Sequence, residues 1–162
     1  MKILVLVPAA LALGAMAQDS PVAMRPGQWA FTTNMTELDM PGSPADMVAA
    51  ARSGLPPAET KARCLSPEQA ADPAATLASP RGNAAGCVFS RRTFANGRID
   101  VAGTCNRPSV GAVQVSLTGS FTPETVNAVI RSDVDHGTML IGGTLTGRRL
   151  GDCVAEVAPS PS

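Results

Sequence analysis

The chain has 162 residues, and its 13 basic and 13 acidic side chains give a formal net charge of zero. This balance argues against nucleic acid or an anionic membrane surface as a partner, because both attract strongly basic proteins. Tyrosine is absent and Trp29 is the single tryptophan, so the chain lacks the aromatic residues that stack on sugars or bases.

Residues 1–17 have the pattern of a signal peptide. Lys2 gives a positive start, residues 3–14 are uncharged and apolar, and Ala15-Met16-Ala17 has the small-x-small pattern of a cleavage site. The apolar run is shorter than the roughly 20 residues that a membrane-spanning helix needs. We therefore expect cleavage after Ala17, export and no membrane span.

Residues 18–157 have the length of one domain with its own core. Residues 158–162 are expected to be a disordered tail. The first element is a strand over residues 28–36, in which large side chains alternate with smaller or polar ones.

A stretch rich in proline and glycine follows at residues 39–57. Within it, Ser43 and Pro44 are typical of the N-cap and the first position of a helix, with Asp46 completing a capping box, and Gly54 is a suitable end. This segment predicts a short helix within a long excursion from the sheet.

A second short helix is predicted after a strand near residues 60–64. Ser66-Pro67-Glu68-Gln69 contains an N-cap, a first-turn proline and the reciprocal glutamine of a capping box. Asp72-Pro73 ends this helix. The small residues from 74 to 86 predict an irregular loop.

From Cys87 onward the chain alternates in the manner of consecutive strands. Asn96-Gly97 is a strong hairpin signal, and Asp135-His136-Gly137 predicts another turn. The predicted strands cover residues 88–94, 98–104, 113–121, 125–134 and 139–145. The first turn joins the first two of these strands, and the second turn joins the last two.

Each of these strands has one apolar face, which must be covered. The sheet must therefore curl into an open barrel or pack its halves together. We predict a mainly β protein: a curved antiparallel meander, forming an open barrel or rolled sheet, with two short helices and two disulfides.

Four cysteines, at positions 64, 87, 105 and 153, allow three pairings. Export favours their oxidation. Cys87 and Cys105 flank the predicted hairpin almost opposite one another, which favours their pairing and leaves Cys64 with Cys153. No two cysteines are close enough in sequence to suggest a zinc site.

The chain has few candidates for catalysis. His136 is the only histidine and falls in a predicted turn, and no Gly-x-Ser-x-Gly motif accompanies it. The carboxylate pairs Glu37/Asp39 and Asp133/Asp135 resemble those of hydrolases, but acidic residues near strand ends are usually solvated. We therefore expect a protein that is not an enzyme and has no cofactor.

Methionines are concentrated near the mature N-terminus, at positions 24, 35, 40 and 47. Thioethers bind Cu(I), so a copper site is an alternative. The spacing contains no close Met-x-Met repeat, and methionine also fills core gaps and lines adaptable apolar sites. Packing is therefore the favoured interpretation.

Three segments together resemble a known family: Pro26-Gly27-Gln28-Trp29, residues 64–70 (CLSPEQA) and residues 147–153 (GRRLGDC). With the signal peptide and the two middle cysteines, they resemble the exported bacterial family DUF3617, a domain of unknown function. The resemblance implies a periplasmic location and supplies no catalytic residues. If Cys64 and Cys153 are bonded, the second and third of these segments meet at one disulfide, where Arg148 or Arg149 can pair with Glu68 or Asp152.

We predict a non-enzymatic binding or envelope-maintenance module, expected to be monomeric. It would hold a small apolar or amphipathic ligand, or an envelope protein, on the curved sheet, with the excursion as a lid. The alternatives are an interaction protein that uses a sheet edge, a copper binder and a hydrolase. The candidate ligand-binding residues are Trp29, Met35, Met47, Arg148 and Arg149.

Overall fold

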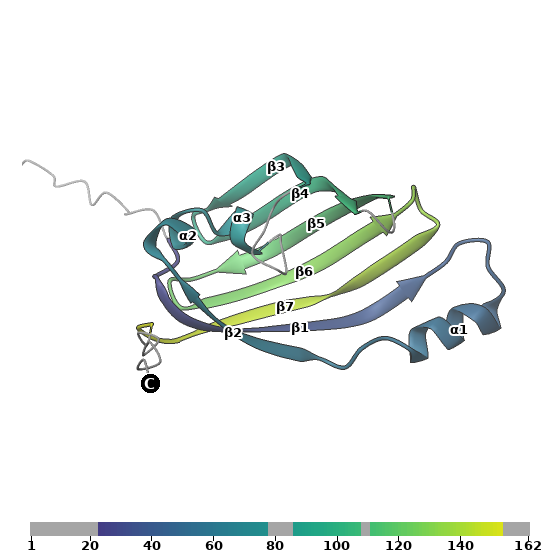
Figure 1. The fold of residues 1–162 in the computed structure, drawn as a ribbon, viewed down its shortest axis with the longest axis horizontal. Coiled ribbons are helices and arrows are strands. Elements are labelled where there is room, and N and C mark those ends of the chain that lie inside the picture. The colour runs from purple at the N-terminus through teal and green to yellow at the C-terminus, as the bar shows by residue number, and fades with distance from the viewer. Residues whose placement is uncertain (1–22, 78–85, 108–110, 154–162) are drawn as a thin grey trace, which may run out of the picture.

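The computed structural model describes residues 23–77, 86–107 and 111–153. Strands account for most of these residues, and short helices interrupt them only in the first half of the chain (Figure 1). In chain order the elements are β1 (Gly27–Asp39), α1 (Ala45–Ser53), β2 (Glu59–Leu65), α2 (Pro67–Ala71), α3 (Pro73–Leu77), β3 (Cys87–Ala95), β4 (Arg98–Arg107), β5 (Gly111–Phe121), β6 (Thr125–Val134) and β7 (Met139–Gly151).

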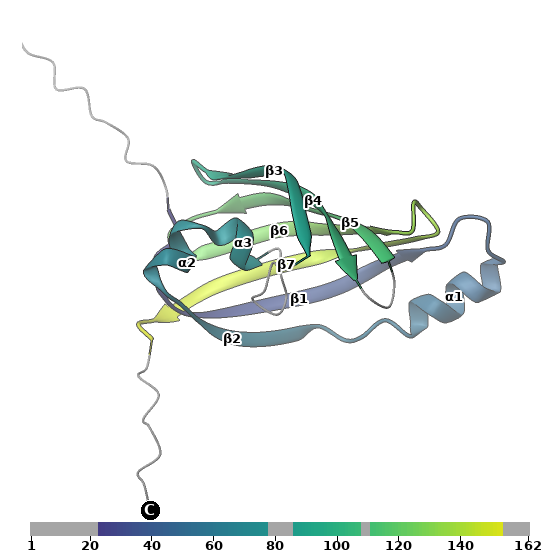
Figure 2. The same cartoon turned by 45° about the horizontal axis from the view of Figure 1, so that its top comes forward.

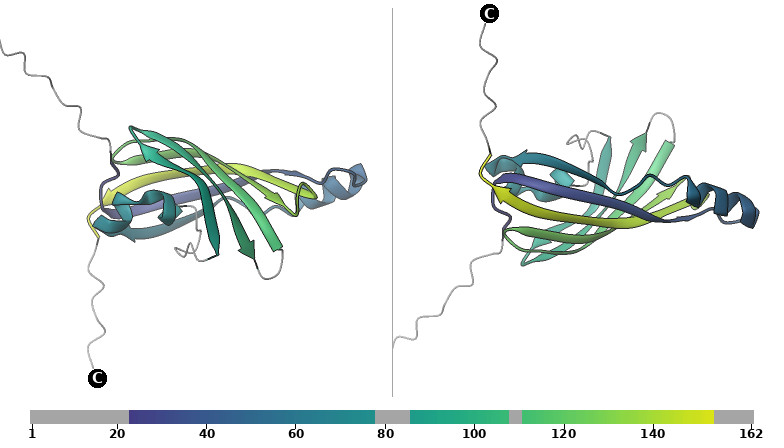
Figure 3. Two further views of the ribbon diagram at one scale, coloured as in Figure 1. Left: turned by 90° about the horizontal axis from the view of Figure 1, so that it is seen from above. Right: turned by 90° about the horizontal axis from the view of Figure 1, so that it is seen from below.

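The seven strands form one antiparallel sheet in the order β2-β1-β7-β6-β5-β4-β3. The sheet does not close, because β2 and β3 are edge strands on opposite sides. Its twist is large: Figure 3 shows that β3 to β5 are strongly rotated relative to β1 and β2. The predicted curved antiparallel meander is confirmed in its open, rolled form.

The pleat of the strands sorts side chains onto two faces. Val101, Leu117 and Ile130 are neighbours across β4, β5 and β6 and lie on what we call the inner face. Asp100 precedes Val101 in β4, and Thr118 follows Leu117 in β5. These two residues pair with each other and lie on the opposite face, which we call the outer face. Leu117 is buried whereas Thr118 is exposed, so the inner face is the one the fold must cover.

The helices α2 and α3 cover one end of the inner face (Figure 2). Their Ala70 and Ala74 join a buried cluster that includes Trp29 and Phe31. The Trp29 and Phe31 rings stack with centroids 5.6 Å apart, and Trp29 Nε1 donates to the Arg25 carbonyl oxygen over 3.0 Å. The packed core begins at this end of the inner face and extends along the sheet to Leu117 and Leu145.

The start of α2 follows the prediction closely. Ser66 Oγ accepts a hydrogen bond from the Gln69 backbone N–H, and the Gln69 side chain accepts one from the Ser66 N–H. The helix ends at the predicted Asp72-Pro73 boundary, with Asp72 as C-cap, but a further helix, α3, covers Pro73–Leu77, where a loop was predicted from residue 74. The proline that ends one helix starts the next, because its fixed φ suits the first helical position.

The first helix departs from the prediction at its start. α1 begins at Ala45 with Pro44 as N-cap and no side-chain capping bond, so the predicted cap at Ser43 is wrong by one residue. Gly54 is the C-cap, as predicted. None of the described helices is long and apolar enough to cross a membrane.

Both predicted turns are confirmed by backbone angles. Asn96 and Gly97 have φ values of 52° and 74°, the left-handed pair that a two-residue type I′ hairpin requires. The Asp135-His136-Gly137 segment joins β6 to β7 with positive φ at each residue.

Both predicted disulfides form. Cys87 and Cys105 are directly opposite one another on β3 and β4. Cys64 of β2 bonds Cys153, which follows β7, and the two strands lie on either side of β1. The second bridge thus clamps the start of β1 between its neighbours.

The two disulfides should contribute unequally to stability. The chain-entropy model gives about 4.6 kcal/mol for a separation of 89 residues and about 3.2 kcal/mol for one of 18. We expect the Cys64→Ala/Cys153→Ala variant to lose about 1.4 kcal/mol more unfolding free energy than Cys87→Ala/Cys105→Ala. Urea denaturation measures both losses, and equal losses would contradict this ranking.

The Ser66 cap provides a second test. Ser66 Oγ also donates to Glu68 Oε2 over 2.6 Å, which holds the pKa of Glu68 below its ordinary value of 4.5. Ser66→Ala should lower the unfolding free energy by about 1 kcal/mol through loss of the cap. It should also raise the pKa of Glu68, which an NMR titration follows.

A depressed pKa stabilises the fold above the ordinary glutamate pKa, and this contribution is lost as the pH falls through the lowered value. Ser120→Ala, at an exposed position of β5, is the control and should change neither quantity. An unchanged Glu68 pKa in Ser66→Ala would show that another group causes the shift.

Candidate ligand-binding cavity

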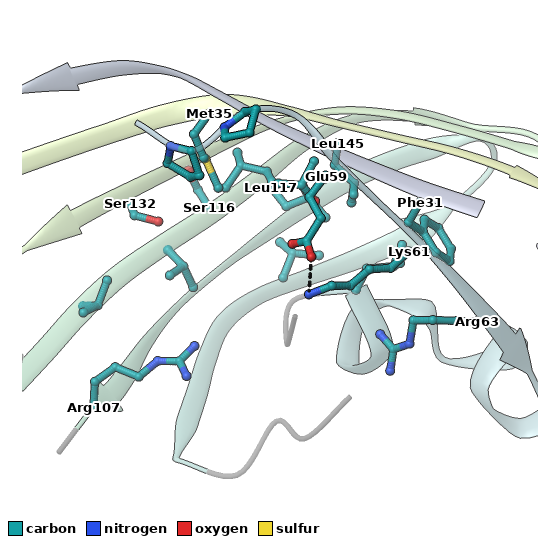
Figure 4. A pocket seen from close by; sticks show the side chains of 18 residues that line it. Phe31, Met35, Glu59, Lys61, Arg63, Arg107, Ser116, Leu117, Ser132 and Leu145 are labelled. Atoms are coloured by element: carbon teal, nitrogen blue, oxygen red, sulfur yellow. Dashed lines mark ion pairs between the residues drawn. The ribbon is translucent and has the colours of Figure 1, made fainter. Parts of the chain in front are cut away.

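Next to α3, the inner face of the sheet lines a cavity of about 390 Å³, and Leu77 of α3 also lines it. Its floor is apolar and consists of side chains from five adjacent strands (Figure 4). The main floor residues are Met35 of β1, Val101 of β4, Leu117 of β5, Ile130 of β6 and Leu145 of β7.

The register of the sheet explains why these side chains meet. Met35 is paired with Gly143, and Gly143 is paired with Ile130. A Cβ at position 143 would lie 2.9 Å from Met35 Sδ and 2.3 Å from the Asn34 carbonyl oxygen. The absence of a side chain at Gly143 therefore lets the methionine lie across β7 and enter the cavity.

One wall comes from the excursion and the edge strand that follows it. Pro56 and Pro57 line the cavity, whereas α1 lies beyond the end of the sheet (Figure 1) and buries none of its residues. Of the excursion that was expected to act as a lid, the end at Pro56 and Pro57 therefore lines the cavity and the helix does not.

The mouth of the cavity is charged. Glu59, Lys61 and Arg63 are alternate residues of β2 and all line the cavity. Glu59 and Lys61 form an ion pair of 3.1 Å, in which both side chains are largely exposed. Arg107, at the end of β4, lines the cavity from the opposite side (Figure 4).

The residues predicted to bind a ligand fall into different surroundings. Met35 lines the cavity, whereas Trp29 is fully buried in the core and Met47 lies on α1 with 54% of its surface exposed. Arg148 is exposed on the outer face. Arg149 is 13% exposed, donates to the Pro26 carbonyl oxygen over 2.9 Å and pairs with Asp152, so it fastens the start of β1 to the end of β7.

Sequence reasoning missed most of the cavity. The charged residues of β2 alternate in the sequence, which places them on one face of a strand. Nothing in that pattern indicates that this face is the inner one. In the folded sheet, Lys61 pairs with Phe31, whose side chain is on the inner face. This pairing, which joins distant parts of the chain, identifies the face.

The candidate catalytic groups lie away from the cavity. His136 is exposed in its turn, and Glu37 is exposed and lies 3.8 Å from Arg131. Across residues 23–77, 86–107 and 111–153, no three His, Cys, Asp or Glu side chains converge in a way that could hold a metal ion. The methionines are also in dissimilar places: Met24 is in the core and Met47 is exposed.

A second hollow, of about 980 Å³, is lined by charged residues of the outer face, including Glu37, Arg91 and Arg131. Arg91 pairs with Asp100 over 3.2 Å, and Glu37 faces Arg131. Exposed pairs of this kind are screened by solvent and contribute little. The inner cavity is therefore the better candidate site.

Comparison with curated proteins gives no match, and comparison with solved structures gives none. A sequence model described as "Protein of unknown function (DUF3617)" matches residues 24–153. The matched segment begins at the buried Met24 and ends at Cys153, so it contains the whole sheet, both disulfides and the cavity. The chain therefore belongs to the DUF3617 family.

Proposed function

We propose that this protein is a non-enzymatic binding module of the bacterial periplasm that holds an apolar or amphipathic ligand in the inner cavity. The observation that carries the proposal is the apolar floor of this cavity, in which Met35, Val115 and Ile130 are only half-buried. A volume of about 390 Å³ falls within the range of small-molecule sites. An apolar ligand would remove that floor from water, which is the main driving force for such binding.

The surrounding scaffold supports a preformed site. The floor belongs to one continuous hydrogen-bonded sheet, and disulfides join β3 to β4 and β2 to the end of β7. A cavity whose walls are already ordered loses less conformational entropy when a ligand binds. Two disulfides also fit the oxidising compartment that the proposed location requires.

A second candidate function is an interaction through the outer edge of β3. Val88 lies on this edge strand and is 75% exposed, and an exposed apolar residue there favours strand addition by another chain. However, β3 carries a register irregularity between Phe89 and Arg91 and two adjacent arginines. Irregular, charged edges resist pairing, so this function ranks second.

Filling the cavity tests the proposal. Val115 is a half-buried residue of β5 that lines the cavity, and Val115→Phe should reduce the affinity for the neutral apolar dye Nile red by at least about tenfold. The added ring occupies the space that the ligand needs. Fluorescence titration measures the dissociation constant.

Thr118→Phe is the matched control, because it adds an aromatic ring to an exposed outer-face position of the same strand. It should leave Nile red affinity within about twofold of the original protein. Native mass spectrometry of protein purified from a periplasm gives an independent test, since a bound ligand adds mass that denaturation removes. Equal dye binding by both variants, or no dye binding at all, would contradict the proposal.

A further inference from the structure

The cavity combines an apolar floor with an excess of positive charge at its mouth. Three cations, Lys61, Arg63 and Arg107, line the cavity, against a single carboxylate, Glu59, among the described residues. Lys61 and Glu59 neutralise each other at 3.1 Å. The excess charge therefore belongs to Arg63 and Arg107.

Neither arginine has an acidic partner in the part of the chain that the structure describes. The ion pairs found there involve other arginines, such as Arg25 with Glu124 and Arg91 with Asp100. Arg63 is also half-buried, and it pairs across the sheet with the fully buried Trp29. A guanidinium partly removed from water gains more from an anionic partner than an exposed one does.

The two guanidinium groups reach towards the cavity from its two sides. Arg63 extends from edge strand β2 and Arg107 from the end of β4, and Figure 4 shows both directed at the space below the apolar floor. The floor residues Leu117 and Leu145 lie on the other side of that space. The cavity is thus apolar at its base and cationic at its entrance.

Inward-facing charges on an edge strand have a second known role, which is to discourage pairing with another sheet edge. That role is satisfied by any charged residue and does not require an excess of one sign. The neutral Glu59–Lys61 pair fits it well. Arg63 lies on the same edge strand and can share this role, but Arg107 cannot, because it lies on β4, which is not an edge strand.

We infer that the ligand is a single-chain amphiphile with an anionic head, specifically a fatty acid. This inference rests on the proposed function and specifies its ligand. The hydrocarbon chain lies on the floor formed by Met35, Leu117 and Leu145, and the carboxylate lies at the mouth between Arg63 and Arg107. Arginine is suited to this role because its planar group binds a carboxylate through two parallel hydrogen bonds.

The size of the cavity favours one hydrocarbon chain. A volume of about 390 Å³ is near the lower end of the range for small-molecule sites, which suits one acyl chain better than the two chains of a phospholipid. A second chain would find no further room at the neighbouring end of the inner face, because α2 and α3 already fill it.

Three probes with the same hydrocarbon chain separate the head group from the tail: laurate, lauryl alcohol and lauryltrimethylammonium. Each is titrated against the protein loaded with Nile red, at a pH where laurate is ionised. We expect laurate to displace the dye at about one-tenth the concentration of lauryl alcohol, because a charge-assisted contact is added to the same apolar contact. The cationic probe should be the weakest, and added salt should reduce the preference for laurate.

The double variant Arg63→Gln/Arg107→Gln tests which residues cause the preference. It should weaken laurate binding about tenfold and leave lauryl alcohol binding within about twofold, which also shows that the variant is folded. Arg148→Gln is the matched control, because it removes one positive charge from an exposed outer-face position. It should leave the laurate preference unchanged.

The possible results separate the two proposals. If wild-type protein binds none of the probes or Nile red, the proposed function fails and the inference fails with it. If lauryl alcohol binds but laurate is not preferred, or if the double variant keeps the preference, the binding function stands and the fatty-acid inference is overturned. Loss of the preference in the double variant, with alcohol binding retained, supports both.

Discussion

The pairing of β1 with β7 is the constraint on which the rest of the structure depends. It runs from Gln28 opposite Gly151 to Asp39 opposite Leu140, and it places the first strand beside the last. Without it, the consecutive strands β3 to β7 would form a sheet whose apolar face had no cover. β1 brings with it β2 and the helices α2 and α3, which supply that cover.

The same pairing divides the inner face into two regions. Near Trp29, the helices fill the curve of the sheet and produce a packed core. Towards Met35 and Ile130, these helices no longer fill the curve of the sheet, and a cavity remains, which Leu77 of α3 also lines. Stability and the proposed binding therefore come from one surface, and the position of α2 and α3 along it sets the boundary between them.

Local patterns in the sequence predict the elements well. The alternation over residues 113–121, the Asn96-Gly97 turn and the capping box at Ser66 each depend on residues close together in the chain, and each is found in the structure. The pairing of Cys87 with Cys105 follows from the same hairpin. Such features are predictable because residues that are close together in the sequence determine them.

The cavity depends on information that local patterns do not contain. The order of strands places β1 between β2 and β7, so the inner face of β2, with Arg63, is determined by residues far away in the chain. The short helix α3 was also missed, because its few residues have no distinct periodicity. The burial of Arg149 could not be predicted either, since it depends on the Pro26 carbonyl and the nearby Asp152.

The position of β1 also has a consequence for the order in which the protein assembles. Trp29 is opposite Arg149, so the first strand of the sheet has no partner on its β7 side until the last strand has been made. Contacts so distant in sequence close slowly, because a long stretch of chain must be ordered to bring them together. Until β1 and β7 pair, the unpaired edge of each strand can bind another chain. The protein is therefore most exposed to aggregation before this pairing forms.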